Sequence, residues 1–151
     1  MIRQRLNEAL KEAMRAKDSV GVSTVRLILA ALKDRDIAAR SKGNTDGIPD
    51  DEVLGLLQTM VKQRRESIKL YEQGGRLDLA EQERAEIGVL QRFLPAQMDE
   101  QAIKTAVETI IKEQAASSLK DMGRIMSVLR DRYAGRMDFG RASGIVKSVL
   151  N

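Results

Sequence analysis

The most concentrated set of basic side chains in the sequence lies near its C-terminus, in residues 118–150. This stretch holds seven Lys or Arg residues against three Asp. Guanidinium and ammonium groups donate charged hydrogen bonds to phosphate oxygens, so the pattern favours sequence-independent contact with a nucleic-acid backbone. The candidate contact residues are Lys120, Arg124, Arg130, Arg136, Arg141 and Lys147.

An ordinary solvated surface stays open as the alternative for this stretch. Local pairs such as Lys120–Asp121 and Arg130–Asp131 would neutralise part of its charge, and modest basic patches are common. In favour of phosphate contact, the last expected helix begins near Asp138. Its N-terminus would offer partial positive charge and free N–H groups.

Aromatic side chains are scarce in the same stretch, which contains only Tyr133 and Phe139. Proteins that bind single-stranded RNA commonly stack bases on several aromatic rings. We therefore expect contacts to an RNA backbone and no sequence specificity toward DNA.

A second charged cluster is expected in the middle of the chain. Arg64, followed by Arg65, falls beside the apolar side of a helix, and Glu83 and Glu86 lie three apart on the next helix. Across a helical hairpin the two glutamates would face Arg64. Two interpretations stay open: a charged pocket for a small acidic group, or ion pairs that fix how the helices pack.

Catalytic and metal-binding motifs are missing from the sequence. It contains no His and no Cys, so a Glu-x-x-His carboxylate metal site, a thiolate site and a Ser/His or Cys/His pair are excluded. No phosphate-binding or dinucleotide-binding glycine motif is present. The sequence favours a non-catalytic protein with no cofactor and no metal.

Apolar residues recur at helical spacing throughout, and no segment alternates as a strand does. Helices are expected over residues 2–17, 24–40, 51–73, 77–93 and 100–112, with two shorter ones after Ser118 and Asp138. Ser23 is the expected N-cap of the second helix, and Val149 is expected to point inward from the last. The predicted fold is all-α, with a four-helix, bundle-like N-terminal part and a small three-helix C-terminal tail.

Pro95 to Met98 is the one credible internal boundary, which predicts domains at residues 1–95 and 96–151. The whole chain has 151 residues and a net charge of +4. The N-terminal stretch has no apolar core typical of a signal peptide, and no apolar run is long enough to span a membrane. With no Cys, these features predict a cytoplasmic protein without a membrane partner.

Several motifs occur in a fixed order along the chain. They include AMRAKD at 13–18, TVRLILAALK at 24–33, VKQRRESI at 61–68 and LAEQERAEI at 79–87. They continue with FLP at 93–95, DMGRIM at 121–126 and AGRMD at 134–138. Taken together, these motifs resemble the YqeY family. The helical region of that family is shared with the C-terminal part of the B subunit of the tRNA-dependent Glu/Asp amidotransferase.

The resemblance implies an all-α protein whose tail contacts tRNA. By position within the motifs, it favours Lys120, Arg124, Arg136 and Arg141 as backbone contacts. It carries over no catalysis, because the ATP and metal site of the amidotransferase lies in a part of the B subunit that this chain lacks.

Three functions stay open. The first is a non-catalytic tRNA- or RNA-binding module, accessory to aminoacyl-tRNA metabolism. The second is a protein–protein adaptor that receives a partner helix in an apolar groove between tail and body. The third is an amidotransferase-like component, a carbon–nitrogen ligase with glutamine as amide donor, which would need other subunits.

Overall fold

The computed structural model describes residues 1–151 and contains helices without any strand, which confirms the all-α prediction. The seven α-helices are α1 (Ile2–Arg15), α2 (Ser19–Arg40), α3 (Asp50–Gln73), α4 (Leu77–Gln91), α5 (Glu100–Glu113), α6 (Met122–Tyr133) and α7 (Phe139–Leu150), with a 3₁₀ turn, η1 (Leu119–Asp121), before α6. None of these helices combines the length and the apolar character that crossing a membrane requires.

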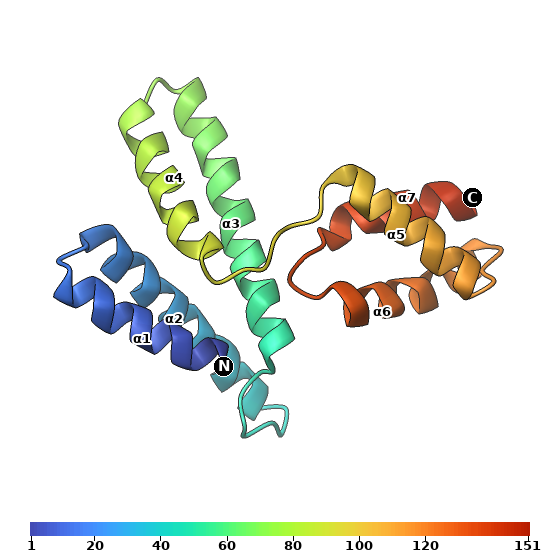
Figure 1. Cartoon of the computed structure of the whole chain (residues 1–151), viewed down its shortest axis with the longest axis horizontal. Coiled ribbons are helices and arrows are strands. Elements are labelled where there is room, and N and C mark those ends of the chain that lie inside the picture. Colours follow the sequence, from blue (N-terminus) through green and yellow to red (C-terminus); the bar gives the residue numbers. More distant parts are fainter. The chain divides into compact units, whose positions relative to one another are not determined.

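The chain forms two compact units, Met1–Pro95 and Ala96–Asn151. The first unit consists of two helical hairpins, α1–α2 and α3–α4, and α2 also packs against α4 (Figure 1). Its core is aliphatic and includes the fully buried side chains Leu6, Val25, Ile28, Val53, Leu57 and Leu90. Burying such a set of apolar side chains is the main driving force for the unit to fold.

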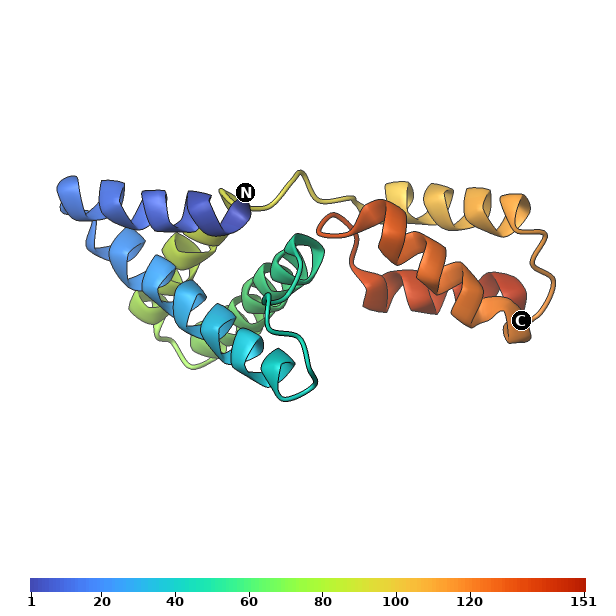
Figure 2. The ribbon, with the colours of Figure 1, turned by 90° about the horizontal axis from the view of Figure 1, so that it is seen from below.

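The second unit consists of α5, α6 and α7, each of which packs against the other two (Figure 2). Its core includes the fully buried side chains Ile103, Val107, Ile110, Ile125, Leu129 and Met137. On α7, Ala142, Val146 and Leu150 point into this core at a spacing of four residues. Val149 is 46% exposed, so the prediction that it points inward is wrong, because it falls beside that four-residue spacing.

The second helix begins at Ser19, five residues earlier than predicted, and its N-cap is Asp18 rather than Ser23. The Asp18 carboxylate accepts a hydrogen bond from the Gly21 N–H at 3.0 Å, as an N-cap does. Gly21 suggests a helix break in the sequence, yet it lies within this first turn, close against the capping side chain. A Cβ at this position would lie 2.5 Å from the Asp18 carboxylate.

Candidate nucleic-acid interface

The second unit presents the predicted contact residues on its surface. The apolar sides of α6 and α7 face the core, so the polar sides of both helices face solvent. All six candidate cations, Lys120, Arg124, Arg130, Arg136, Arg141 and Lys147, are exposed. The fold therefore leaves each of them accessible to a large ligand.

Asp121 organises the turn that carries Lys120. Its carboxylate accepts hydrogen bonds from the backbone N–H groups of Ser117, at 2.9 Å, and Ser118, at 3.3 Å. These bonds lower the pKa of Asp121 below its ordinary value, and the nearby Arg124 guanidinium adds to the effect. The carboxylate pairs with Arg124 at 3.1 Å and not with Lys120, so Lys120 keeps an uncompensated charge.

Arg136 lies in the turn between α6 and α7, and its backbone is held on both sides. Gly135 has a φ of +78°, a left-handed conformation that favours glycine. The carbonyl of Gly135 accepts a hydrogen bond from the Gln97 side chain, and that of Arg136 accepts one from the Met98 N–H at 2.8 Å. Met137 is fully buried. The backbone is thus fixed while the Arg136 side chain stays exposed, which limits the entropy lost on binding a ligand.

The N-terminus of α7 is less available to phosphate than the sequence suggested. The Asp138 carboxylate accepts hydrogen bonds from the N–H groups of Gly140, at 3.0 Å, and Arg141, at 3.2 Å. It also lies 3.7 Å from the Arg141 guanidinium. A capping carboxylate therefore occupies the position where an anion would bind. Further along the helix, Lys147 is exposed and forms no ion pair.

Arg130 lies near an aromatic ring rather than an acid. Its guanidinium carbon is 5.9 Å from the centroid of the Phe139 ring, at the outer limit of a cation–π contact. The local pairs Lys120–Asp121 and Arg130–Asp131, considered from the sequence, do not form in this structure. An ion pair that sequence spacing did not suggest joins Arg132 to Glu113 on α5 at 2.8 Å.

The candidate cations therefore fall into two groups. Arg124 and Arg141 are each paired with an aspartate three residues earlier. Lys120, Arg130, Arg136 and Lys147 have no acidic partner within 4.0 Å. The six do not share one helix face, because positions six apart, such as 124 and 130, differ by about 120° around a helix. A ligand that contacts them all must therefore reach more than one face of α6 and α7.

The second predicted cluster, on the α3–α4 hairpin, is an ion pair with an extra carboxylate. The Nε atom of Arg64 lies 3.0 Å from Glu86 and 3.9 Å from Glu83. The Arg64 and Glu86 side chains are each 13% exposed. Burial, and then the charge of Glu86, raise the pKa of Glu83. Arg65, the next residue of α3, is exposed to solvent and forms no ion pair with Glu83 or Glu86.

The arrangement joins two helices at mid-length and leaves the Arg64 charge compensated. Arg64 also donates a hydrogen bond to the carbonyl of Met60 at 3.3 Å, so its donors are directed within the hairpin. No group of three or more acidic side chains in the structure is arranged to hold a metal ion.

The fold and its surface define a class of protein: an all-α chain in which a helical body of two hairpins is followed by a three-helix unit with exposed, unpaired cations. The family model described as Yqey-like protein matches residues 3–150. The chain belongs to this family, and the resemblance seen in the sequence is confirmed.

Curated relatives are similar along much of the chain. A protein of Clavispora lusitaniae is 28% identical over 144 residues, covering 93% of this chain and 80% of the relative. A protein of Pyrenophora tritici-repentis is 33% identical over 135 residues, covering 85% of this chain and 71% of the relative. One of Eremothecium gossypii is 35% identical over 91 residues, covering 60% of this chain and 48% of the relative. All three are named altered inheritance of mitochondria protein 41, mitochondrial.

The prediction of a cytoplasmic location is contradicted by these relatives, which are named as mitochondrial proteins. The prediction rested largely on the lack of cysteine. That feature suits any compartment in which thiols stay reduced and does not single out the cytoplasm.

Proposed function

We propose that the second unit, Ala96–Asn151, binds RNA through its phosphate backbone, and that tRNA is its natural class of ligand. The observation that carries the proposal is the group of four exposed cations without acidic partners, Lys120, Arg130, Arg136 and Lys147. Each is available to replace a counterion on a phosphate, which is the main source of sequence-independent affinity for nucleic acids.

The resemblance of the tail to the B subunit of the tRNA-dependent amidotransferase supports tRNA as the ligand class. The conformation of Arg136 supports the same proposal, because its backbone is fixed before any ligand arrives. The ion pairs at Arg124 and Arg141 suggest that these two residues contribute less than the resemblance implied. A phosphate would have to compete with Asp121 or Asp138 for each of them.

The test is a titration of the full chain against bulk tRNA at several salt concentrations. We expect micromolar affinity at about 50 mM salt and a log–log slope that reports three to five neutralised phosphates. The triple variant Lys120→Ala, Arg136→Ala, Lys147→Ala should lose at least tenfold in affinity. Its slope should become shallower by about two, since each lost contact removes roughly 0.7 to 0.9.

A second triple variant provides the matched control. Lys62, Arg65 and Lys69 are exposed residues of α3 in the first unit and form no ion pair in the structure. Changing these three to Ala removes the same charge from the chain and should leave tRNA affinity within about twofold. Equal losses from both triples would mean that net charge alone is responsible, and no binding at low salt would exclude RNA as the ligand.

An adaptor role through a groove between tail and body stays a prediction. An amidotransferase-like role likewise stays a prediction that rests on resemblance alone.

A further inference from the structure

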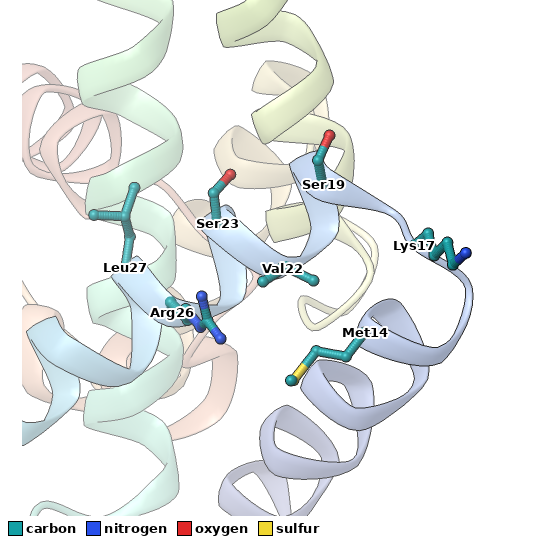
Figure 3. Close-up of a pocket in the computed structure, with 7 residues that line it drawn as sticks. All are labelled: Met14, Lys17, Ser19, Val22, Ser23, Arg26 and Leu27. Atoms are coloured by element: carbon teal, nitrogen blue, oxygen red, sulfur yellow. The ribbon is translucent and has the colours of Figure 1, made fainter.

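The outer surface of the α1–α2 hairpin carries an open groove of about 760 Å³. Its lining residues are Met14, Lys17, Ser19, Val22, Ser23, Arg26 and Leu27 (Figure 3). Three of them are apolar, two are cationic and two carry hydroxyl groups, and none is acidic. Met14 and Leu27 are 53% and 49% exposed, which is high for large apolar side chains. The groove is shallow and open to solvent, so it suits a ligand that lies along the surface rather than one that is enclosed.

The groove continues into a row of exposed residues from Arg26 to the C-terminal end of α2. Arg26, Lys33 and Arg40 are seven positions apart, so they lie along one side of the helix. Ala30 and Ile37 fall between them, and all five residues lie within a strip about 80° wide. Ile37 is 51% exposed. The row therefore alternates cationic and apolar side chains over about 20 Å of helix.

The cations of this surface form no direct ion pair. No ion pair within 4.0 Å involves Lys17, Arg26, Lys33 or Arg40, although exposed arginines elsewhere in the chain form several. Only Arg40 lies close enough to an acid, Asp36, for its charge to help lower the pKa of that carboxyl. Water solvates such charges well, but it does not solvate the apolar side chains between them. This combination favours a ligand that carries apolar groups for the groove and negative charges for the cations beside it.

We propose that this surface binds an acidic amphipathic helix of a partner protein. A facing helix with acidic residues seven apart would match the spacing of Arg26, Lys33 and Arg40, which is about 10.5 Å from one to the next. The apolar side chains of the partner helix would fill the groove beside Met14 and Leu27 and would also contact the exposed Ile37 side chain. This is the helix-in-groove mode of recognition, with anchors three, four and seven residues apart.

A helix fits the observations better than a nucleic acid or a lipid surface does. Contacts to a nucleic-acid backbone would use the cations alone and leave the exposed apolar side chains Met14, Leu27 and Ile37 uncovered, whereas the apolar face of a helix covers them. A lipid surface would gain little, because binding to it scales with the apolar area buried and the large exposed apolar side chains here are only Met14, Leu27 and Ile37. The proposal does not depend on RNA binding by Ala96–Asn151, because the groove and the row belong entirely to the first unit.

The test is a selection with the full chain as bait and a displayed library of helix-forming 20-residue peptides with no bias in charge. We expect the recovered peptides to be amphipathic with acidic residues beside the apolar face, and to bind at micromolar concentration. The charge-reversed variant Arg26→Glu, Lys33→Glu should weaken them at least tenfold. The variant Met14→Ser, Leu27→Ser should do the same, since it removes the apolar anchors.

The control variant Lys62→Glu, Lys69→Glu reverses two exposed, unpaired charges on α3 and should leave peptide affinity unchanged. Circular dichroism checks that every variant keeps its helical content. The proposal is overturned if the selection yields no binder, if the binders are basic or uncharged, or if the control weakens them equally. It is also overturned if Arg26→Glu, Lys33→Glu weakens binding to bulk tRNA or to anionic phospholipid vesicles tenfold instead.

Discussion

Arg3 and Asp36 lie 33 positions apart in the sequence and are joined by two parallel hydrogen bonds of 2.7 and 2.9 Å. Each partner also binds the backbone of Ile48. Arg3 donates to its carbonyl at 2.9 Å, and Asp36 accepts from its N–H at 2.9 Å. Three segments thereby meet at one point: the start of α1, the C-terminal half of α2 and the end of the loop that precedes α3. This contact explains why a loop rich in Gly and polar residues ends in a fixed, buried Ile48.

We predict that Asp36→Asn destabilises the chain by about 1 kcal/mol at neutral pH, because it weakens a bidentate, charge-assisted contact that is partly exposed. Urea unfolding followed by circular dichroism measures the difference. Asp34→Asn is the matched control, since Asp34 is exposed on the same helix and forms no ion pair. Equal effects of the two substitutions would contradict the assignment of Asp36 as the joining residue.

The contact between Arg3 and Asp36 also makes the stability of the fold depend on pH in the acid range. The hydrogen bonds from Arg3, followed by that from Ile48, lower the pKa of Asp36 from 3.8 to about 2. A carboxyl with a lowered folded-state pKa stabilises the fold above its unfolded pKa and loses that contribution as pH falls toward the folded value. The stability advantage of the natural chain over Asp36→Asn should therefore shrink between about pH 4 and pH 2. A constant difference over that range would show that the charge of Asp36 is not responsible.

The Arg64 cluster should also give a substitution cost that shrinks toward acid, but through a raised rather than a lowered carboxyl pKa. We predict that Arg64→Met destabilises the chain by about 2 kcal/mol at pH 7, because it leaves Glu83 and Glu86 as neighbouring, half-buried like charges. Without the guanidinium, nothing offsets the repulsion between the two carboxylates, so the pKa of Glu83, already raised by burial and by Glu86, rises further. The cost is full above that folded-state pKa and disappears as pH falls from it toward the unfolded value. Urea unfolding at several pH values tests this, with the exposed Arg65→Met as control.

A companion substitution isolates the surplus carboxylate. The pKa of Glu83 is already raised by burial and by Glu86, so its charged form opposes folding at neutral pH. We predict that Glu83→Gln leaves stability unchanged or raises it by up to about 1 kcal/mol at pH 7, with the gain lost toward pH 4. A loss of stability at pH 7 would mean that Glu83, at 3.9 Å, is an essential partner of Arg64.

Sequence patterns predicted the helices well wherever apolar spacing and capping residues agreed. Asp99 caps α5 by accepting from the Ala102 N–H, and Gly135 takes the left-handed conformation that ends α6. The pairing of Arg64 with the α4 glutamates could also be anticipated, because a hairpin of two long helices places those positions opposite each other. In each case the residues that decide the feature are close in the sequence, or are brought together by the short turn between α3 and α4.

Other features depend on contacts that sequence spacing does not encode. Gly21 suggests a break, and only the position of the Asp18 carboxylate reveals that it belongs to the first turn of α2. Which cations of the tail remain unpaired is decided by individual rotamers: Asp121 binds Arg124, three residues on, and leaves the adjacent Lys120 unpaired. The α1–α2 groove was not predicted either, because Met14 and Leu27 have the types expected of core residues.

Thr24 offers a prediction about the core of the first unit. It is the one fully buried polar side chain in the structure, and its hydroxyl has no hydrogen-bond partner. Thr24→Val keeps the shape and removes the unsatisfied group, so we expect stability to rise by about 1 kcal/mol. Thr59→Val is the control, because the exposed Thr59 hydroxyl donates to the Gly55 carbonyl at 3.1 Å and its loss should give no gain. A destabilised Thr24→Val variant would show that the hydroxyl has a partner after all.

The last prediction separates stability from binding at two glycines. Gly144 of α7 and Gly88 of α4 are both exposed within helices, and a Cβ added to either would meet no atom within 4 Å. Replacing either by Ala should stabilise the chain by about 0.5 to 1 kcal/mol, since Ala has the higher helix propensity. Gly144 lies on the surface of α7 between Arg141 and Lys147. If the RNA backbone approaches α7 closely there, Gly144→Ala should weaken tRNA binding several-fold, whereas Gly88→Ala should not. Unchanged tRNA affinity in both variants would place the RNA contacts elsewhere on the second unit, nearer Lys120 and Arg136.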